Sequence, residues 1–402
     1  MSISIREYRA RRARVLKELK GAAAVVLAGE GSAPLRGRWR ADRNFYWLTG
    51  IDTEPGAAVL FDPAAPNPDH QVVLFLRPVN PEVDRWDGYR DEITPTLRER
   101  YGFSAIFRSA SLPAFLTGAA RRGKRLACLH PFSVYPAPVS ADLALFRQVA
   151  ERVPGTAIED RTQLLIAQRA VKSAAELALM RQAAATTAEG YRAVFQLLKP
   201  GVNESAIQAA LENAYRATGG DRETPYNSIV GSGLNGTVLH YMENQAEARA
   251  GELVVIDSAA AAEGYAADVT RTLPVSGTFS AEQRKLYEIV LAAEEAAIRK
   301  VRPGVTMREV DAAAREVITA AGYGHTFIHS VGHPLGLDVH EAPPDGPLRA
   351  GMVVTIEPGI YLPDAKTGIR IEDDILVTRR GPVNLTAAIP KTVRALEAAL
   401  RR

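Results

Sequence analysis

Three of the chain's seven histidines lie in one short segment, at His329, His333 and His340. On a helix, a four-residue spacing such as that of His329 and His333 would place both imidazoles on one face. Gly332 and Pro334 flank His333, however, and a proline inside a helix removes a hydrogen bond and clashes with the preceding turn. We therefore expect a strand or tight loop that turns its imidazoles toward a common point.

Four carboxylates accompany strand-like apolar segments. Asp257 ends the run LVVID, and Asp268 follows eleven residues later, so a hairpin would bring the two side by side. Glu357 lies within VVTIEPGIY, and Glu372 lies within GIRIEDDILV. A single such residue could be a solvated strand end, but ionised carboxylates in segments this apolar are costly to bury unless they are paired or bind metal. Four of them together with a histidine-rich loop indicate a metal centre.

This donor set suits two divalent cations, because four carboxylates and one imidazole can hold a pair of ions if two of the carboxylates bridge. Two neighbouring cations would clamp a water molecule and produce hydroxide at neutral pH. Hard oxygen donors with a single nitrogen favour Mn²⁺, and Co²⁺ or Zn²⁺ are also compatible. The single cysteine, Cys128, excludes an internal disulfide and a cysteine-based metal cluster.

The hydrophobic periodicity predicts two regions around this donor set. Residues 1–160 alternate short apolar strands with helices and are typical of an α/β domain. The expected strands are 23–28, 57–62 and 72–77, and the expected helices are near 90–101 and 140–150. Residues 161–402 twice place two helices before strands, which suggests a pseudo-repeat. The expected helices are a long tract ending near 199, then 204–217, 280–300 and 307–321, and the expected strands are 251–257, 351–362 and 369–377.

Two features of the first region leave alternatives open. Residues 1–20 are strongly basic, which could indicate a nucleic-acid-binding arm or an import signal. A surface helix that buries Tyr8 and Val15 and leaves its cations solvated is favoured instead. Trp86 stands in the polar segment DRWDGYR, where it could belong to a core, to an interface or to the wall of a binding pocket.

Bulk properties exclude several classes of protein. A net charge of +3 gives no electrostatic case for nucleic-acid binding. The longest apolar run near the start, residues 21–29, is too short to span a bilayer, and no secretory signal precedes it. We expect a soluble cytoplasmic protein that binds neither nucleic acid nor membrane.

The order of the five donors resembles the dinuclear site of the pita-bread metallopeptidases. Segment 329–341 resembles the signature of their Xaa-Pro peptidase branch, which contains prolidase and aminopeptidase P. Three further motifs carry the same resemblance: N-G-x-x-x-H-Y at 235–241, I-E-P-G-I-Y at 356–361 and G-I-R-I-E-D-D at 368–374. Ala259 departs from the glycine frequent in relatives, without changing a ligand.

The resemblance implies a two-domain fold. Residues 171–402 match the family closely, whereas residues 1–160 resemble its creatinase-like N-terminal domain more loosely, chiefly through FYWLTG at 45–50. We expect a creatinase-like N-terminal α/β domain over residues 1–160, followed by a pita-bread α+β catalytic domain over residues 161–402.

The resemblance also implies the role of each metal ligand. Asp257 would chelate one cation, His333 and Glu357 would hold the other, and Asp268 and Glu372 would bridge the two. Glu357 would also accept a proton from the attacking water.

Substrate-handling roles follow in the same way. His240 and His340 would flank the scissile bond and steady the tetrahedral intermediate. Arg370 would orient the substrate and the ligands around it. Four residues are expected to bind substrate: Tyr226, Tyr361, Trp86 and His329. The alternative for His240 is a core histidine in a strand, and for Arg370 a structural ion pair beside Glu372.

These roles predict a metal-dependent peptidase for the Xaa-Pro bond, acting on dipeptides or short peptides. A dipeptidase is favoured, because Arg370 and the arginines of segment 36–43 could bind the proline carboxylate and cap the site. The alternative is an aminopeptidase P that acts on longer chains. A creatinase-type hydrolase and a non-catalytic binding module are disfavoured because either would be expected to lack ligands, and methionine aminopeptidase is disfavoured because it lacks the first domain. We expect a homodimer in which Trp86 contributes across the interface.

Overall fold

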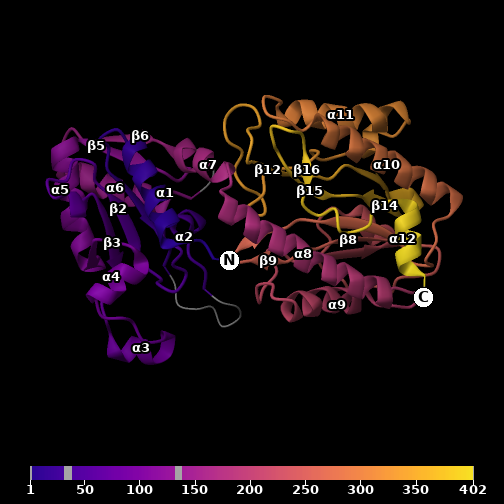
Figure 1. The fold of residues 1–402 in the computed structure, drawn as a ribbon, viewed down its shortest axis with the longest axis horizontal. Helices are drawn as coiled ribbons and strands as arrows, with labels where there is room; N and C mark the ends of the chain where they lie inside the picture. The colour runs from indigo at the N-terminus through magenta and orange to yellow at the C-terminus, as the bar shows by residue number, and fades with distance from the viewer. Residues whose placement is uncertain (1, 31–38, 132–137, 402) are drawn as a thin grey trace. The chain divides into compact units, whose positions relative to one another are not determined.

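The computed structural model describes residues 2–30, 39–131 and 138–401 (Figure 1). The chain divides into two compact units, an N-terminal unit of residues Ile3–Arg169 and a C-terminal unit of residues Ala170–Arg402 with the first two residues. The domain boundary expected after residue 160 stays a prediction. Within the described residues, no helix combines the length and the apolar character needed to cross a membrane.

The N-terminal unit is built on a mixed sheet in the order β1-β2-β3-β4. β1 and β2 pair antiparallel, as do β2 and β3, whereas β3 and β4 pair parallel. The strands are β1 (Ala24–Leu27), β2 (Ala58–Phe61), β3 (Val72–Leu76) and β4 (Ala105–Arg108). β5 (Arg125–Cys128) and β6 (Ala157–Asp160) form a parallel pair, and a single parallel bridge joins Leu126 of β5 to Ala23, the residue before β1. The three expected strands are confirmed, and their apolar side chains form the core of this unit.

Helices cover this sheet and connect its strands. They are α1 (Ile5–Glu18), α2 (Arg43–Thr49), α3 (Pro81–Asp87), α4 (Pro95–Tyr101), α5 (Leu112–Gly123), α6 (Ala141–Arg152) and α7 (Thr162–Ala170), with 3-10 turns η1 (Pro68–His70) and η2 (Ser109–Ser111). The helix expected over 90–101 begins only at Pro95, because proline is well suited to the first turn of a helix, where no N–H is needed.

The basic segment at the start of the chain forms a helix, α1, as expected. Tyr8 and Val15 are buried on its inner face. The expectation that its cations stay solvated is wrong for Arg11 and Arg12, which are also buried. Their guanidinium groups donate to backbone carbonyls of α2 and of Gly102 at 2.6–2.9 Å, so hydrogen bonds offset their burial.

The C-terminal unit places two helix pairs around its strands (Figure 1). The pairs are α8 (Ala174–Leu197) with α9 (Glu204–Ala217), and α10 (Ala281–Lys300) with α11 (Met307–Ala320), and α12 (Val393–Leu400) closes the chain. Capping boxes begin α8, α10 and α11, because Ser or Thr at each N-cap exchanges hydrogen bonds with Glu or Gln three residues on. The twice-repeated order of helix pair and strands agrees with the expected pseudo-repeat.

The strands of this unit form several small antiparallel sheets. One has the order β11-β8-β7, another β12-β15-β16, and two further pairs are β13-β14 and β9-β10. The strands are β7 (Ile229–Ser232), β8 (Leu253–Asp257), β9 (Ala261–Ala262), β10 (Tyr265–Ala266), β11 (Thr270–Pro274), β12 (Val353–Ile356), β13 (Gly359–Leu362), β14 (Thr367–Arg370), β15 (Asp373–Leu376) and β16 (Val383–Asn384). Three 3-10 turns connect them: η3 (Gly233–Thr237), η4 (Gly324–Thr326) and η5 (Pro363–Ala365).

Two expected strands, 351–362 and 369–377, are each broken in the middle. The first divides into β12 and β13, and the second divides into β14 and β15. Pro358 contributes to the first break because it has no N–H to donate to a strand ladder. The expectation that Glu357 and Glu372 lie inside strands is therefore wrong, because both stand in these breaks.

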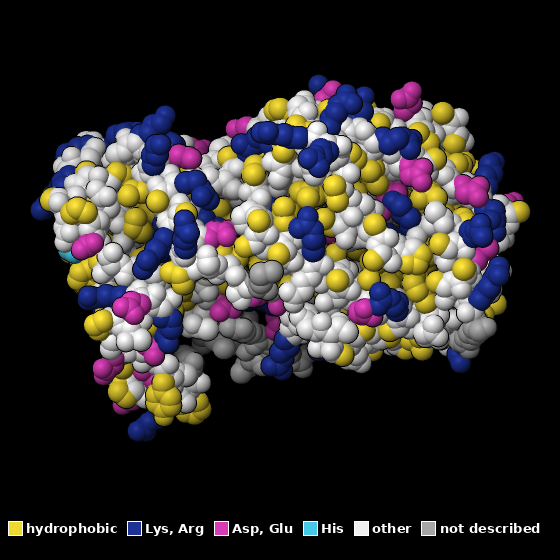
Figure 2. All heavy atoms as spheres, in the orientation of Figure 1, with side chains coloured by type: hydrophobic (Ala, Val, Ile, Leu, Met, Phe, Trp, Pro, Cys, Tyr) yellow, Lys and Arg dark blue, Asp and Glu magenta, His cyan; other side chains and the backbone are white. Residues whose placement is uncertain are grey.

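Charge on the surface follows no single sign. Figure 2 shows cationic and anionic side chains interspersed over the visible face of each unit. This arrangement agrees with the small net charge of +3.

Candidate active site

The two aspartates meet because β8 and β11 pair side by side. Asp257 ends β8 and lies opposite Thr270 at the start of β11. The chain between them turns through β9 and β10 and returns with Asp268 two residues before Thr270. Both carboxylates are buried, and the hairpin expected from the sequence is confirmed.

The two glutamates meet at the paired strand breaks. Ile356 pairs with Asp373 on one side of the two breaks, and Gly359 pairs with Arg370 on the other side. The antiparallel register therefore continues across the breaks. Glu357 and Glu372 therefore lie opposite one another, where the backbone of the two strands is freed from regular pairing. The backbone N–H of Glu372 donates to the carbonyl of Thr270 at 3.1 Å, which ties this break to the strand behind the aspartates.

The histidine-rich segment is an irregular loop, as expected, and it runs along the edge of β12. The backbone N–H of Thr355 donates to the carbonyl of His333 at 2.9 Å, and that of Glu357 donates to Val331 at 2.7 Å. Gly332 has φ of +155°, and a Cβ there would lie 2.0 Å from the carbonyl oxygen of Thr355. Only glycine lets the loop approach the strand so closely.

His333 is oriented by its own loop. Its Nδ1 lies 3.2 Å from the carbonyl oxygen of Pro334, which can only accept, so Nδ1 carries the proton. Its Nε2 lone pair then faces Asp268 at 3.6 Å and Glu357 at 3.5 Å. A histidine held in this way by a backbone carbonyl is the usual arrangement of a metal ligand.

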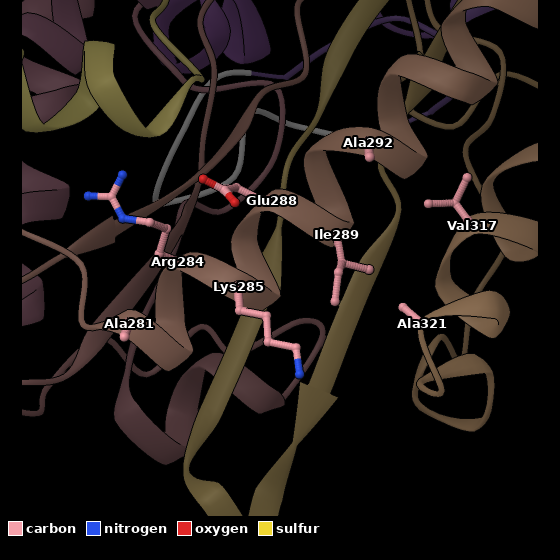
Figure 3. Close-up of a pocket in the computed structure, with 8 residues that line it drawn as sticks. All are labelled: Ala281, Arg284, Lys285, Glu288, Ile289, Ala292, Val317 and Ala321. Atoms are coloured by element: carbon pink, nitrogen blue, oxygen red, sulfur yellow. The ribbon is translucent and has the colours of Figure 1, made fainter.

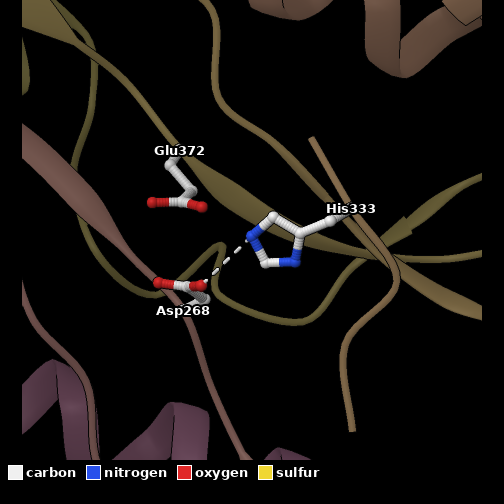
Figure 4. Close-up of side chains that lie close together, drawn as sticks. All are labelled: Asp268, His333 and Glu372. Carbon is white, nitrogen blue, oxygen red and sulfur yellow. Dashed lines mark ion pairs between the residues drawn. The ribbon is translucent and has the colours of Figure 1, made fainter. Parts of the chain in front are cut away.

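Three of these side chains converge on one point. Figure 4 shows the carboxylates of Asp268 and Glu372 turned toward the imidazole of His333. One donor atom from each lies within 4.8 Å of the others, which suits a shared cation. The donors are hard oxygens and one neutral nitrogen, and the described residues place no thiolate among them, so the set fits divalent cations such as Mn²⁺.

Electrostatics support the same conclusion. Burial raises the pKa of Asp268 and of Glu372 well above the usual range, and neighbouring carboxylates raise both further. Burial likewise raises the pKa of Glu357 to about 8, although Arg370 opposes the shift. Burial lowers the pKa of His333 to about 4 and keeps its imidazole neutral. Several buried carboxylates cannot all be ionised without compensating positive charge, which divalent cations would supply.

Asp257 differs from the other acids because both of its oxygens already have protein donors. The hydroxyl of Tyr226 donates to Oδ1 at 2.7 Å, and Nη2 of Arg370 donates to Oδ2 at 2.8 Å. The same guanidinium donates to Thr270 at 3.1 Å and to Tyr361 at 3.1 Å. Arg370 thus forms a buried ion pair with Asp257, which agrees with the alternative of a structural ion pair.

Tyr361 extends this chain of hydrogen bonds to the rim. Nδ1 of His329 lies 2.9 Å from the carbonyl oxygen of Ser330, so the ring donates there, and its Nε2 accepts from the Tyr361 hydroxyl at 2.9 Å. Burial lowers the pKa of His329 to about 4. The Tyr361 hydroxyl thus links His329 to Arg370, and the expected role of Tyr361 in substrate binding stays a prediction.

A cavity of about 280 Å³ opens over these groups. Its walls bring together most of the expected site residues: His240, Asp257, His329, His333, His340, Glu357 and Arg370. The rings of His333 and His340 lie 4.2 Å apart between centroids. His240 is exposed in a turn after η3, so its alternative as a core histidine in a strand is wrong.

A second hollow lacks comparable chemistry. A groove of about 440 Å³ lies between α10 and α11, and Figure 3 shows Ile289, Ala292 and Val317 along it with Lys285 and Glu288 nearby. It contains neither an imidazole nor a carboxylate cluster among its described lining residues. The cavity with the histidines is therefore the candidate active site.

Several expectations concern the N-terminal unit. Trp86 lies on α3 with 90% of its surface exposed, and its role in substrate binding stays a prediction. Arg36 and Arg38 lie outside the described residues, whereas Arg43 begins α2.

One residue of this site was missed from the sequence. The Thr270 hydroxyl donates to Glu372 at 2.7 Å and accepts from Arg370. It therefore joins a candidate metal ligand to the buried guanidinium group of Arg370. Its place opposite Asp257 in a period-two strand could have indicated this role.

Comparison with known proteins agrees with this geometry. The sequence pattern of metallopeptidase family M24 matches residues 178–379, and that of the aminopeptidase P N-terminal domain matches residues 8–127. Xaa-Pro aminopeptidase of Escherichia coli (strain K12) is 32% identical over 449 residues, covering 100% of this chain and 99% of the relative. Zinc-substituted aminopeptidase P of E. coli in complex with product superposes with a TM-score of 0.88 at 29% identity and covers 100% of both chains.

A dipeptidase relative matches a smaller part of the chain. Xaa-Pro dipeptidase of Pyrococcus horikoshii is 37% identical over 233 residues, which cover 57% of this chain and 64% of the relative. The expected fold, a creatinase-like N-terminal α/β domain before a pita-bread α+β catalytic domain, is confirmed, and the first domain matches the aminopeptidase P N-terminal pattern. The expected family is also confirmed. The chain belongs to metallopeptidase family M24, in the Xaa-Pro peptidase branch of the pita-bread enzymes.

Proposed function

We propose that this protein is an Xaa-Pro aminopeptidase, which removes the N-terminal residue from peptides with proline in second place. The observation that carries the proposal is the position of Glu357 opposite Glu372 at the strand breaks, near Asp268 and His333. A cavity walled by His240 and His340 opens over this group. An Xaa-Pro bond has no N–H on its leaving side and a fixed φ, so peptidases that depend on that N–H are handicapped. A metal site avoids this requirement.

The preference for a dipeptidase is replaced by its alternative. That preference required Arg370 to bind the carboxylate of a terminal proline, but its guanidinium is engaged by Asp257, Thr270 and Tyr361. The aminopeptidase relative also matches this chain over its full length, whereas the dipeptidase relative matches 57% of it. Both observations favour an enzyme that acts on longer chains.

In this proposal each group has a stated task. When bound, two divalent cations lower the pKa of water and polarise the substrate carbonyl. The carboxylate of Glu357 accepts a proton from the attacking water, and the imidazoles of His240 and His340 donate to the oxygen that develops negative charge. Arg370 orients Asp257 through one carboxylate oxygen, and Tyr226 orients it through the other.

Mn²⁺ is the cation that we propose, on the chemistry of the donor set, with Co²⁺ or Zn²⁺ as substitutes. The similar structure from E. coli is a zinc-substituted form of that enzyme. We also propose a cytoplasmic homodimer in which the exposed Trp86 lies at the interface, because a large aromatic surface of this kind is typically covered by a partner.

Hydrolysis of matched peptides tests the proposal. We expect Ala-Pro-Ala to be cleaved after alanine with a higher kcat/KM than Ala-Pro, in the presence of Mn²⁺ and not after chelation. Ala-Ala-Ala is the control for proline specificity. Faster cleavage of Ala-Pro than of Ala-Pro-Ala would restore the dipeptidase, and metal-independent activity would exclude both.

A further inference from the structure

The turn that carries His240 is held by one buried carboxylate outside the active site. Glu204 is the first residue of α9 and is fully buried. Its two oxygens accept five hydrogen bonds from the segment of residues 232–246, which passes over it. The donors to Oε1 are Ser232 N–H at 2.7 Å, Ser232 Oγ at 2.7 Å and Asn235 Nδ2 at 3.1 Å, and the donors to Oε2 are Tyr241 Oη at 3.2 Å and Ala246 N–H at 2.9 Å.

These contacts explain how a carboxylate can be buried there. An ionised carboxylate without donors is costly in an apolar interior, whereas five donors and a helix N-terminus satisfy it. The backbone N–H of Glu204 also donates to the carbonyl of Ala246 at 2.9 Å. Both the backbone and the side chain of Glu204 therefore bind the segment. The segment is therefore clamped at its beginning, middle and end.

The segment of residues 232–246 buries polar groups and exposes apolar ones, which is the reverse of an ordinary surface loop. Its polar residue Asn244 is buried and bonds to Gln208, Val230 and the carbonyl of Ser228. Apolar side chains of the same segment are instead about half exposed: Leu234, Val238 and Met242. Surface loops usually expose polar groups, so this inversion requires buried polar anchors such as Glu204.

His240 depends on this backbone for its position. Its side chain is exposed and lines the cavity together with Leu239. In the described structure its imidazole makes no hydrogen bond, in contrast to His329 and His333, which are each oriented by a carbonyl. The neighbouring residue, Tyr241, is the one that bonds directly to Glu204.

We propose that Glu204 is a positioning residue that acts through His240. It fixes the turn of residues 238–241 so that the imidazole faces the scissile bond. This inference rests on the proposed function, because the task of His240 is to donate to the oxygen of the tetrahedral intermediate. Glu204 itself touches neither the metal-ligand candidates nor the cavity.

A double-mutant cycle tests the proposal. Glu204→Gln preserves shape and the acceptor at Oε1, but it turns an amide NH₂ toward the N–H of Ala246. We expect kcat to fall about tenfold, a fraction of the hundredfold or more that an oxyanion donor supplies. KM and metal content should stay close to wild type. In a His240→Ala background the same substitution should lower kcat no further, because the residue through which it acts is gone.

A control and a second readout separate positioning from stability. Glu397 lies on α12, and its carboxylate accepts from the backbone N–H of Phe279 and from Arg284. Glu397→Gln removes the negative charge of this carboxylate and should leave kcat unchanged. Hydrogen–deuterium exchange should increase in residues 232–246 of Glu204→Gln and not in β8 or β12. Tyr241→Phe removes one donor without a cavity and should give a smaller change of the same kind.

Several results would overturn the inference. An equal loss of kcat in the His240→Ala background, a loss of bound metal, or unchanged exchange in residues 232–246 would each do so. Wild-type protein that cleaves no Xaa-Pro peptide would instead count against the proposed function, and the exchange measurement would still decide whether Glu204 holds the turn.

Discussion

Replacing Glu372 by glutamine should stabilise the metal-free protein and weaken its response to metal. The side chain is buried opposite Glu357, and its Oε2 accepts from the hydroxyl of Thr270 at 2.7 Å. Glutamine keeps the size of the side chain and can keep this hydrogen bond. It removes the negative charge, which in the metal-free protein is repelled by Asp268 and Glu357.

The magnitude follows from the spacing of the donors. Donor atoms of Asp268 and Glu372 lie within 4.8 Å, and two unit charges at that separation repel by about 3 kcal/mol at an effective dielectric constant of about 20. Burial raises the pKa of Glu372 in the folded state, so the folded protein binds more protons than the unfolded chain above the usual carboxylate pKa. Stability of the metal-free wild type should therefore fall as pH rises through this window, and Glu372→Gln should reduce that fall.

Urea unfolding at pH 5 and pH 8, with EDTA or with excess Mn²⁺, measures these effects. A ligand at 100 times its Kd stabilises a one-site protein by about 2.7 kcal/mol, and we expect wild type to gain at least this amount and Glu372→Gln clearly less. Glu397→Gln, whose partners lie outside the site, is the control for a generic loss of stability. A metal-free Glu372→Gln that is less stable than wild type at pH 8, or one that retains the full response to Mn²⁺, would refute the bridging role.

Three further predictions concern other parts of the chain. His240→Ala and His340→Ala should each lower kcat by about two to three orders of magnitude with metal content intact, and steady-state kinetics with metal analysis would contradict this if kcat fell less than about fivefold. Asp142→Asn should destabilise the protein by about 3 kcal/mol at pH 7, because it breaks the partly buried pair with His130. Although burial opposes it, hydrogen bonds and the charges of nearby aspartates raise the pKa of His130 to about 10, and, against the effect of burial, hydrogen bonds to His130 and Ser140 lower the pKa of Asp142 to about 2. The stabilisation is therefore complete between about pH 4 and pH 6.5 and disappears as pH rises through about 10. Urea unfolding in which the wild type and Asp142→Asn differ as much above pH 10 as at pH 6 would contradict this. Light scattering should show a dimer that Trp86→Ala weakens, and a fully active wild-type monomer would exclude the interface.

Residue types and spacing were enough to predict much of the architecture and to select candidate metal ligands, three of which the structure brings together. Helices 204–217, 280–300 and 307–321 were predicted almost to their ends, because caps and 3.6-residue periodicity are local properties of the chain. Gly332 and Pro334 likewise indicated a loop before any partner was known. Buried carboxylates in apolar segments predicted a charged cofactor for the same reason, since the cost of burying them does not depend on the details of the fold.

The tertiary structure decided where those groups point and which of them are already paired. Glu357 and Glu372 lie opposite one another because of the register between two strand pairs, and local pattern cannot reveal such a register. The partner of Arg370 is Asp257, more than one hundred residues away. Glu204 looks like an ordinary helix-start carboxylate in the sequence, and only folding brings the turn of His240 over it. Long-range pairing of buried polar groups depends on geometry across the whole unit, so it is decided by the fold and not by the neighbouring residues.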